Sequence, residues 1–290
     1  MTSRTKTDSR RSSQASPPSV PVRDVDITPV HEWNDGRLRA QQDYLAAEEP
    51  LEIRINGHPL SVTMRTPGHD LELAAGFLFT EGIIARADQI VSIEHASKCK
   101  ATERGNIVDV KLAPDAEWDF EKSRRNFFAT SSCGICGKAS IEAVRARGVR
   151  PANANCHVSA ATICSMPEKL RAQQQNFART GGLHAAALFT ASGDLLAERE
   201  DIGRHNAVDK IAGWALRENK LPLAECVLLV SGRGGFEIVQ KAAVAGVSVV
   251  ASVSACSSLA VQFAREMRMT LIGFVRGSRF VIYCGDDRLK

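Results

Sequence analysis

Residues 226–275 read CVLLVSGRGGFEIVQKAAVAGVSVVASVSACSSLAVQFAREMRMTLIGFV. The apolar runs at 226–230, 247–253 and 270–275 are typical of strands that are buried on both faces. The segments between them, 236–246 and 257–268, have the apolar spacing of helices. This order of strand, helix, strand, helix and strand predicts an α/β fold in which helices cover a mixed or parallel sheet.

Elements upstream extend this predicted sheet. LHAAALFT (183–190) and LLAERE (195–200) flank the turn Ser192-Gly193 and predict a hairpin, and NAVDKIAGWALREN (206–219) predicts an amphipathic helix. Ser165 and Glu168 form a capping-box pattern ahead of KLRAQQQNF, which predicts a helix beginning there.

The N-terminal half predicts a smaller α+β region. LEIRINGHPLSVTM (51–64) alternates around Asn56-Gly57, a dipeptide that favours a type I′ hairpin turn. Apolar residues recur with helical spacing after Asp70, and NIVDVKL (106–112) has the composition of a strand. We therefore divide the chain into a basic, Ser/Pro-rich tail predicted to be disordered (1–30), a small α+β region (31–130), a loop with helices (131–180) and an α/β domain (181–290).

Composition excludes several classes of protein. The chain has 290 residues, of which 44% are hydrophobic, enough for a substantial core. No apolar run approaches the roughly 20 residues of a membrane span, and the N-terminus lacks the apolar segment of a secretory signal, so we expect a cytoplasmic protein. Residues 1–24 hold five Arg or Lys and two Asp, which accounts for +3 of the net charge of +4. The rest is nearly neutral and does not predict nucleic-acid binding.

The segment SSCGICGK (131–138) holds two closely spaced thiols, Cys133 and Cys136, beside Gly134 and Gly137. Such a pair suits a metal site, a dithiol that cycles with a disulfide, or a thiol that carries sulfur. A closed zinc site needs further ligands, for which Cys156 and His157 are candidates at an unusual spacing. A zinc deaminase would require H-x-E, which the chain lacks near these cysteines.

Two glycine- or serine-rich turns follow predicted strands. SGRGG (231–235) precedes a helix, so its N–H groups and Arg233 could face an anion, although it is not a P-loop. SVSACSS (252–258) is a second such turn, and two turns at one sheet edge would form a ligand crevice. His184 and DIGRHNAVDK (201–210) add polar groups between apolar elements.

Together these segments resemble one family. SSCGICGK, GGLHAAAL, EDIGRHNAVDK, SGRGGFEIVQKAAVAGV and LIGFVRGSRFVIY are similar to motifs of the formate dehydrogenase accessory sulfurtransferases, the FdhD family, and the resemblance extends over roughly residues 45–285. It implies a C-terminal three-layer α/β/α domain similar to cytidine deaminase, and a homodimer. It also implies a sulfur carrier that takes persulfide sulfur from a cysteine desulfurase and passes it to molybdenum bis(molybdopterin guanine dinucleotide), a bound substrate destined for formate dehydrogenase.

The resemblance also assigns residues. Cys133 would carry the persulfide, with Cys136 as its partner and no permanent metal. The cofactor would contact FVRGSR, which comprises Phe274, Val275, Arg276, Gly277, Ser278 and Arg279. A non-catalytic chaperone that binds the molybdenum cofactor and grips metal through its thiolates remains the alternative.

Overall fold

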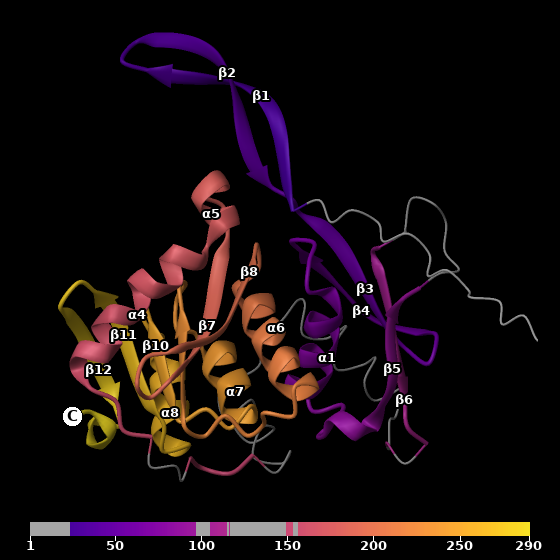
Figure 1. The fold of residues 1–290 in the computed structure, drawn as a ribbon, viewed down its shortest axis with the longest axis vertical. Helices are drawn as coiled ribbons and strands as arrows, with labels where there is room; N and C mark the ends of the chain where they lie inside the picture. The colour runs from indigo at the N-terminus through magenta and orange to yellow at the C-terminus, as the bar shows by residue number, and fades with distance from the viewer. Residues whose placement is uncertain (1–23, 97–104, 115, 117–148, 153–155) are drawn as a thin grey trace, which may run out of the picture.

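A computed structural model describes residues 24–96, 105–114, 116, 149–152 and 156–290. The described chain forms a six-stranded sheet with helices on both faces, a four-stranded sheet with one helix, and a two-stranded ribbon that projects from the body (Figure 1). The α/β class predicted from the apolar runs is confirmed.

The six-stranded sheet has the order β12-β11-β10-β9-β7-β8. Its centre is parallel: β10 (Val249–Ser252) pairs with β9 (Cys226–Val230) and with β11 (Thr270–Arg276). The flanking strands are antiparallel, and they are β7 (His184–Thr190), β8 (Leu195–Asp201) and β12 (Arg279–Cys284). The sheet is therefore mixed, and the hairpin predicted around Ser192-Gly193 is confirmed.

Helices bury both faces of this sheet. One face packs against α6 (Arg204–Arg217), α7 (Phe236–Val244) and α8 (Ser258–Glu266). The other packs against α4 (Ala160–Gln173), which is followed by α5 (Gln175–Thr180). Within β9, Leu228 and Val230 belong to the first core and Val227 and Leu229 to the second, which is why the strand is apolar without alternation.

The start of α4 differs from the prediction. Ser159 is the N-cap, with its hydroxyl accepting from the N–H of Thr162 at 3.0 Å, so the capping box placed at Ser165 and Glu168 was wrong. Ser165 lies inside the helix, where its hydroxyl donates to the carbonyl of Thr162 at 2.8 Å. A hydroxyl that bonds back to the preceding turn is compatible with a helix interior, so the sequence pattern alone could not fix the start.

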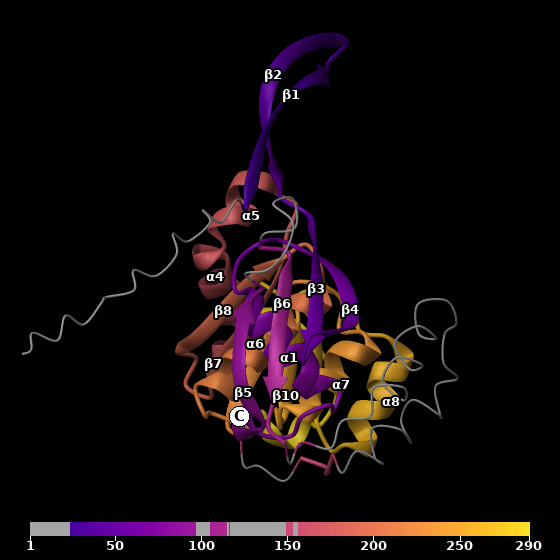
Figure 2. The same ribbon diagram turned by 90° about the vertical axis from the view of Figure 1, so that its right-hand side faces the viewer.

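The smaller sheet has the order β4-β3-β6-β5 and packs against α1 (Asp70–Thr80) (Figure 2). The hairpin of β3 (Glu49–Ile55) and β4 (His58–Arg65) turns at Asn56 and Gly57, with φ of 51° and 81°, as predicted. The remaining strands are β5 (Ile90–His95) and β6 (Ile107–Leu112). Short 3₁₀ turns lie at Ala87–Gln89 and Asp286–Arg288.

A close helix crossing joins the two sheets. A Cβ on Gly76 of α1 would lie 1.8 Å from the carbonyl oxygen of Asp209, and one on Gly213 of α6 would lie 1.8 Å from that of Glu72. Only glycine permits this approach. Beside it, the buried Lys241 ammonium donates at 3.0 Å to Thr80, Glu81 and Asp209, so α1, α6 and α7 share one buried polar cluster.

The projecting ribbon consists of β1 (Val25–Asn34) and β2 (Arg37–Ala46). This ribbon was not predicted from the sequence, and the boundary predicted at residue 30 falls inside β1. Half of the residues in its strands are polar and Pro29 interrupts the first, so neither strand has the continuous apolar run by which β9, β10 and β11 were found. No helix among the described residues is long and apolar enough to span a membrane.

Candidate functional site

The candidate site lies where the parallel strands β9, β10 and β11 end. The loop 231–235 after β9 contacts the loop 253–257 after β10, since the N–H of Gly234 donates to the carbonyl of Ala255 at 3.0 Å. The N–H of Phe274 near the end of β11 donates to the carbonyl of Ser254, also at 3.0 Å. The two turns predicted to meet at one sheet edge therefore do meet there, together with the predicted cofactor segment.

Glycines allow these loops to touch. A Cβ on Gly234 would lie 2.9 Å from the sulfur of Cys256, and one on Gly232 would lie 3.1 Å from Nδ1 of His184. A Cβ on Gly273 would lie 2.8 Å from the ring of Tyr283. Each distance is too short for a side chain without movement of its neighbour, so the glycine-rich sequences here are explained by close approach.

Basic side chains gather at this edge. His184 begins β7, Arg204 begins α6 and Arg233 lies in the loop 231–235. Burial lowers the pKa of His184, and the positive charges of Arg204 and Arg233 lower it further against the opposing effect of Asp201. Nε of Arg204 is buried and has no hydrogen-bond partner among the described residues. The edge is therefore arranged to favour a bound anion.

Three helices also start at this edge. The N-caps of α6, α7 and α8 are Gly203, Gly235 and Ser257, and the unpaired N–H groups of such helix starts carry partial positive charge. His205 contacts Glu237 at 3.2 Å, and burial lowers its pKa while Glu237 raises it. Helix termini and guanidinium groups together suit phosphate oxygens.

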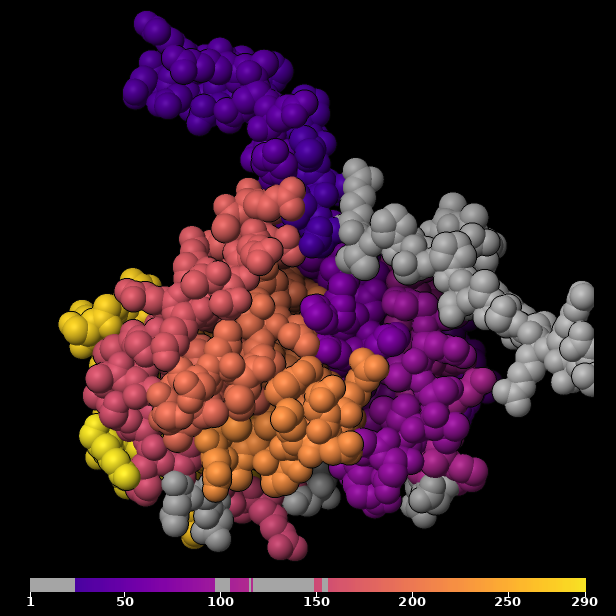
Figure 3. All heavy atoms as spheres, in the orientation of Figure 1, coloured from indigo at the N-terminus to yellow at the C-terminus, as the bar shows by residue number. Residues whose placement is uncertain are grey.

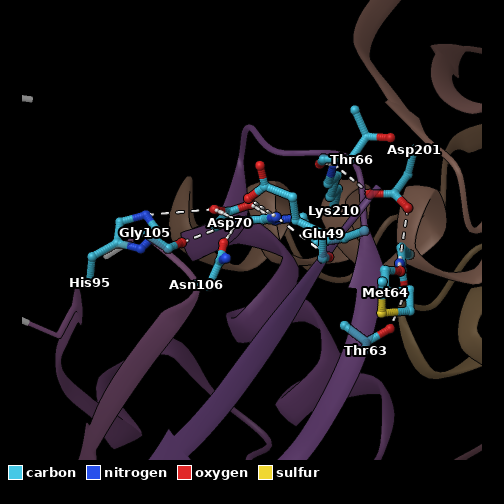
Figure 4. Close-up of polar contacts among 12 residues, drawn as sticks. Glu49, Thr63, Met64, Thr66, Asp70, His95, Gly105, Asn106, Asp201 and Lys210 are labelled. Carbon is cyan, nitrogen blue, oxygen red and sulfur yellow. Dashed lines mark hydrogen bonds and ion pairs between the residues drawn. The ribbon is translucent and has the colours of Figure 1, made fainter. Parts of the chain in front are cut away.

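A buried polar network positions the start of α6 (Figure 4). Oδ2 of Asp201 lies 2.7 Å from the Lys210 ammonium, and its Oδ1 accepts from the N–H of Gly203 and from Nδ2 of Asn206 at 2.8 and 2.9 Å. Lys210 also donates to the carbonyls of Thr66 and Glu200, both at 3.1 Å. Within DIGRHNAVDK, the residues Asp201, Asn206 and Lys210 are therefore structural, and they hold the turn that carries Arg204 and His205.

The same network extends into the smaller sheet. Nδ2 of Asn206 donates to the carbonyl of Met64 at 2.8 Å. The next residue, Arg65, is only 2% exposed, and its guanidinium binds both carboxylate oxygens of Asp70, at 3.0 and 3.1 Å. Figure 4 shows this second cluster, in which Asn106, Glu49 and the carbonyl of Gly105 also accept from the Arg65 guanidinium. The polar sequence 63–70 therefore connects the smaller sheet to the site-bearing helix.

The predicted cofactor segment divides into buried and exposed parts. Val275 is fully buried, so a ligand could reach only its backbone. Phe274 is half-buried with a φ of 53°, and Arg276 pairs with Arg279 across the exposed hairpin turn between β11 and β12. Both guanidinium groups are thus available to a ligand. Cys133 and Cys136 lie outside the described residues, so their predicted roles stay predictions.

A groove of about 480 Å³ opens beside the same loops. It is lined by Cys256, Ser258, Val261, Gln262, Arg265, Glu266 and Tyr283. Its volume falls within the range of pockets that hold small molecules. Burial, and then Cys284, raise the pKa of Cys256 to about 12, so this thiol stays protonated.

Other described cysteines share this property. Burial raises the pKa of Cys226 to about 11 and raises the pKa of Cys156 and Cys284 as well. A thiol must ionise to act as a nucleophile, so these four are poor carriers of sulfur. Among the described residues no three His, Cys, Asp or Glu side chains gather as metal ligands.

Sequence reasoning found part of this site. It identified the two turns, and it identified Arg233 and His184, but it did not single out Arg204. That residue follows a predicted strand and Gly203 and begins a helix, which is the same pattern that was noted at 231–235. It also had no means of separating the buried Asp201 and Lys210 from residues free to bind, because both kinds are polar in sequence.

Comparisons with known proteins agree on one family. The sequence profile described as the FdhD/NarQ family matches residues 46–290. Proteins named sulfur carrier protein FdhD are similar over most of the chain. The one from Streptomyces avermitilis is 51% identical over 261 residues, covering 88% of this chain and 92% of its own. That from Mycobacterium tuberculosis is 49% identical over 266 residues, covering 90% and 96%.

A solved structure shares the fold. The crystal structure of a Desulfotalea psychrophila protein, assigned as a formate dehydrogenase accessory protein, superimposes with a TM-score of 0.73 at 23% sequence identity. It covers 92% of this chain and 99% of its own.

Proposed function

The chain belongs to the FdhD/NarQ family, and on this premise we propose that it is a sulfur carrier protein that serves the maturation of formate dehydrogenase. The observation that carries the proposal is the extent of the match, which runs from residue 46 to the C-terminus and includes the CGIC segment. The relatives at about half identity carry the name sulfur carrier protein.

The chemistry proposed for this role uses Cys133 and Cys136. The Cys133 thiolate takes the outer sulfur of a cysteine desulfurase persulfide, which returns that enzyme's thiolate and leaves a persulfide on Cys133. The Cys136 thiolate then attacks the inner sulfur. This attack releases hydrosulfide to the molybdenum substrate and leaves a Cys133–Cys136 disulfide, which a cellular thiol reductant reopens.

The raised pKa values of four described cysteines support this assignment. Cys156, Cys226, Cys256 and Cys284 are held as thiols by burial, so none competes well as a nucleophile near neutral pH. Cys133 follows the polar stretch Thr130, Ser131 and Ser132, whose hydroxyl and N–H groups can stabilise a thiolate. These four thiols are therefore poorer candidates for carrying sulfur than the CGIC pair.

The proposed substrate is molybdenum bis(molybdopterin guanine dinucleotide), held at the carboxyl edge of β9–β11. The basic residues Arg204, Arg233 and His184, the glycine-rich loop and three helix starts support binding of its phosphates there. Arg276 and Arg279 on the neighbouring hairpin could add bidentate contacts. We also propose a homodimer that acts in the cytoplasm.

Two measurements test the proposal. After treatment with cysteine and a desulfurase, the protein should gain the mass of a sulfur atom, which a thiol reductant then removes. If the protein gains no mass, the alternative function is supported, in which it is a non-catalytic chaperone whose thiolates bind metal. Separately, calorimetry with GDP should show at least about tenfold weaker binding, or about 1.4 kcal/mol, when Arg276 and Arg279 are both changed to Ala. Binding within about twofold would contradict the assignment of this hairpin.

A further inference from the structure

The β1–β2 ribbon stands clear of the body of the protein (Figures 1 and 3). Each strand has ten residues, and they pair antiparallel in continuous register from Val25–Ala46 to Asn34–Arg37. The two strands form a sheet of their own, which no other described strand joins. Contacts with the body gather at the base, where Asn176 donates to Asp24 at 2.9 Å and the Arg179 guanidinium lies 5.2 Å from the centroid of the Tyr44 ring.

The pleat sorts the ribbon's side chains onto two unlike faces. Because neighbours in a strand point to opposite sides, residues with odd numbers in β1 share a face with their partners in β2. We call this the apolar ribbon face, and it comprises Val25, Ile27, Pro29, His31 and Trp33 with Leu38, Ala40, Gln42, Tyr44 and Ala46. Eight of these ten are apolar or aromatic. On the other face only Val30 and Leu45 are apolar.

Beyond its base, where Val25 and Ala46 are partly buried, the apolar ribbon face is open to solvent. Trp33 is 69% exposed and its cross-strand partner Leu38 is 62% exposed, next to the turn. Nearer the base, Ile27 is 54% and its partner Tyr44 is 40% exposed. Two-stranded sheets are marginal in water without a further surface to pack on. An ordered ribbon with this pattern therefore needs a covering surface.

We propose that a second copy of this chain covers the apolar ribbon face, in a two-fold arrangement where each ribbon packs on the body of the other copy. This inference locates an interface for the homodimer of the proposed function. The face carries no acidic or basic residue apart from His31, so its partner surface should be uncharged. Apolar, uncharged contacts are typical of homodimers, whereas transient encounters are more polar.

The size of the face favours a reciprocal arrangement. At about 3.3 Å per residue and about 10 Å of width for two strands, a ten-residue ribbon offers a face of roughly 330 Å². One such contact would bury roughly 660 Å² in total, below the roughly 1,200 Å² at which stable interfaces begin. A two-fold axis makes the contact twice and buries roughly 1,300 Å². A donor or recipient enzyme that met one ribbon face alone would bury only the roughly 660 Å² of a single contact.

The test is the sedimentation of the full chain. We expect the unchanged protein to sediment as a dimer, and the double variant Trp33→Asp, Leu38→Asp to raise the dimer dissociation constant at least about a hundredfold, since it places two charges at the most exposed apolar pair of the face. The matched control alters the opposite face at a neighbouring cross-strand pair, Glu32→Ala with Arg39→Ala, and should leave the dimer intact.

A measurement without substitutions accompanies this test. Hydrogen exchange of the ribbon amides in the unchanged protein should slow as the concentration rises through the dimer dissociation constant. A monomeric unchanged protein, a dimer that survives the Trp33 and Leu38 changes, or ribbon exchange that is independent of concentration would each overturn the proposal. Sulfur loading is measured on the same samples, so a failed interface is distinguished from a failed sulfur carrier.

Discussion

Replacing Gly213 by Ala should destabilise the protein although alanine is the better helix former. The new Cβ would lie 1.8 Å from the carbonyl oxygen, 2.7 Å from the carbonyl carbon of Glu72 and 2.8 Å from the nitrogen of Gly76. All three are backbone atoms of α1, so no side chain can rotate away. Ordinary contact needs about 3.4 Å, and α1 and α6 would have to separate by roughly 1.6 Å in a close-packed interior.

Two effects of opposite sign set the magnitude. Overpacking a core costs about 1–3 kcal/mol and more where backbone must move, and we take the upper end, about 3 kcal/mol, because the obstacle is a helix backbone. Alanine in place of glycine returns about 1 kcal/mol of helix propensity. The net loss is therefore about 2 kcal/mol, which corresponds to roughly 4–8 °C in Tm for a chain of this size.

Thermal and urea unfolding measure this loss. The control is Gly182→Ala, where a Cβ would lie 3.5 Å from the Cβ of Ala46, an ordinary contact, and the free energy of unfolding should change by less than about 0.5 kcal/mol. If Gly213→Ala is as stable as the unchanged protein, α1 and α6 are not as close as described and the reasoning fails.

Three further predictions follow from buried or partly buried charges. The pKa of Glu198 is raised to about 7, chiefly by burial and then by Glu200. Because the folded protein holds this proton more tightly than the unfolded chain, the free energy of unfolding falls as pH rises from about 4.5 to about 7. Glu198→Gln should therefore raise Tm at pH 8 more than at pH 5, and an equal effect at both would contradict the assignment. A bound phosphate should raise the lowered pKa of His184, so protonation of this imidazole should strengthen GDP binding as pH falls toward and below 6.5 in calorimetry, and His184→Gln should remove this contribution. Lys241→Met leaves the buried Asp209 without its cation and should cost about 3–5 kcal/mol in urea unfolding. Adding Asp209→Leu should recover part of this cost, and no recovery would mean that lost packing, not an unpaired carboxylate, sets it.

The sequence predicted those elements whose burial or turn geometry determines the residue types at successive positions. Continuous apolar runs identified β9, β10 and β11 because both of their faces are covered, and Asn56-Gly57 identified its hairpin because the turn requires positive φ. The β1–β2 ribbon could not be found this way, since the described chain covers it only at its base and its strands lack a sustained apolar run. Local hydrophobic patterns thus identify the helices and strands that pack against other parts of the same chain.

The site was predictable only in outline. The glycine-rich turn 231–235 was predicted to face an anion, and the structure adds a close approach that the sequence did not predict, to His184 and Cys256. Which charged residues are buried was not predictable, because Lys210 finds Asp201 and the carbonyl of Thr66 through packing between distant segments. The order of polar residues in the sequence does not show which of them form buried ion pairs.

The most direct test of the sulfur-carrier account is peptide mass spectrometry of desulfurase-treated protein, with formate dehydrogenase activity as the readout of delivery. The account predicts a persulfide on Cys133 in the unchanged protein and in Cys136→Ser, no stable persulfide in Cys133→Ser, and poor maturation of formate dehydrogenase by either variant. A persulfide found on Cys136 in the unchanged protein, or undiminished maturation by Cys133→Ser, would contradict it.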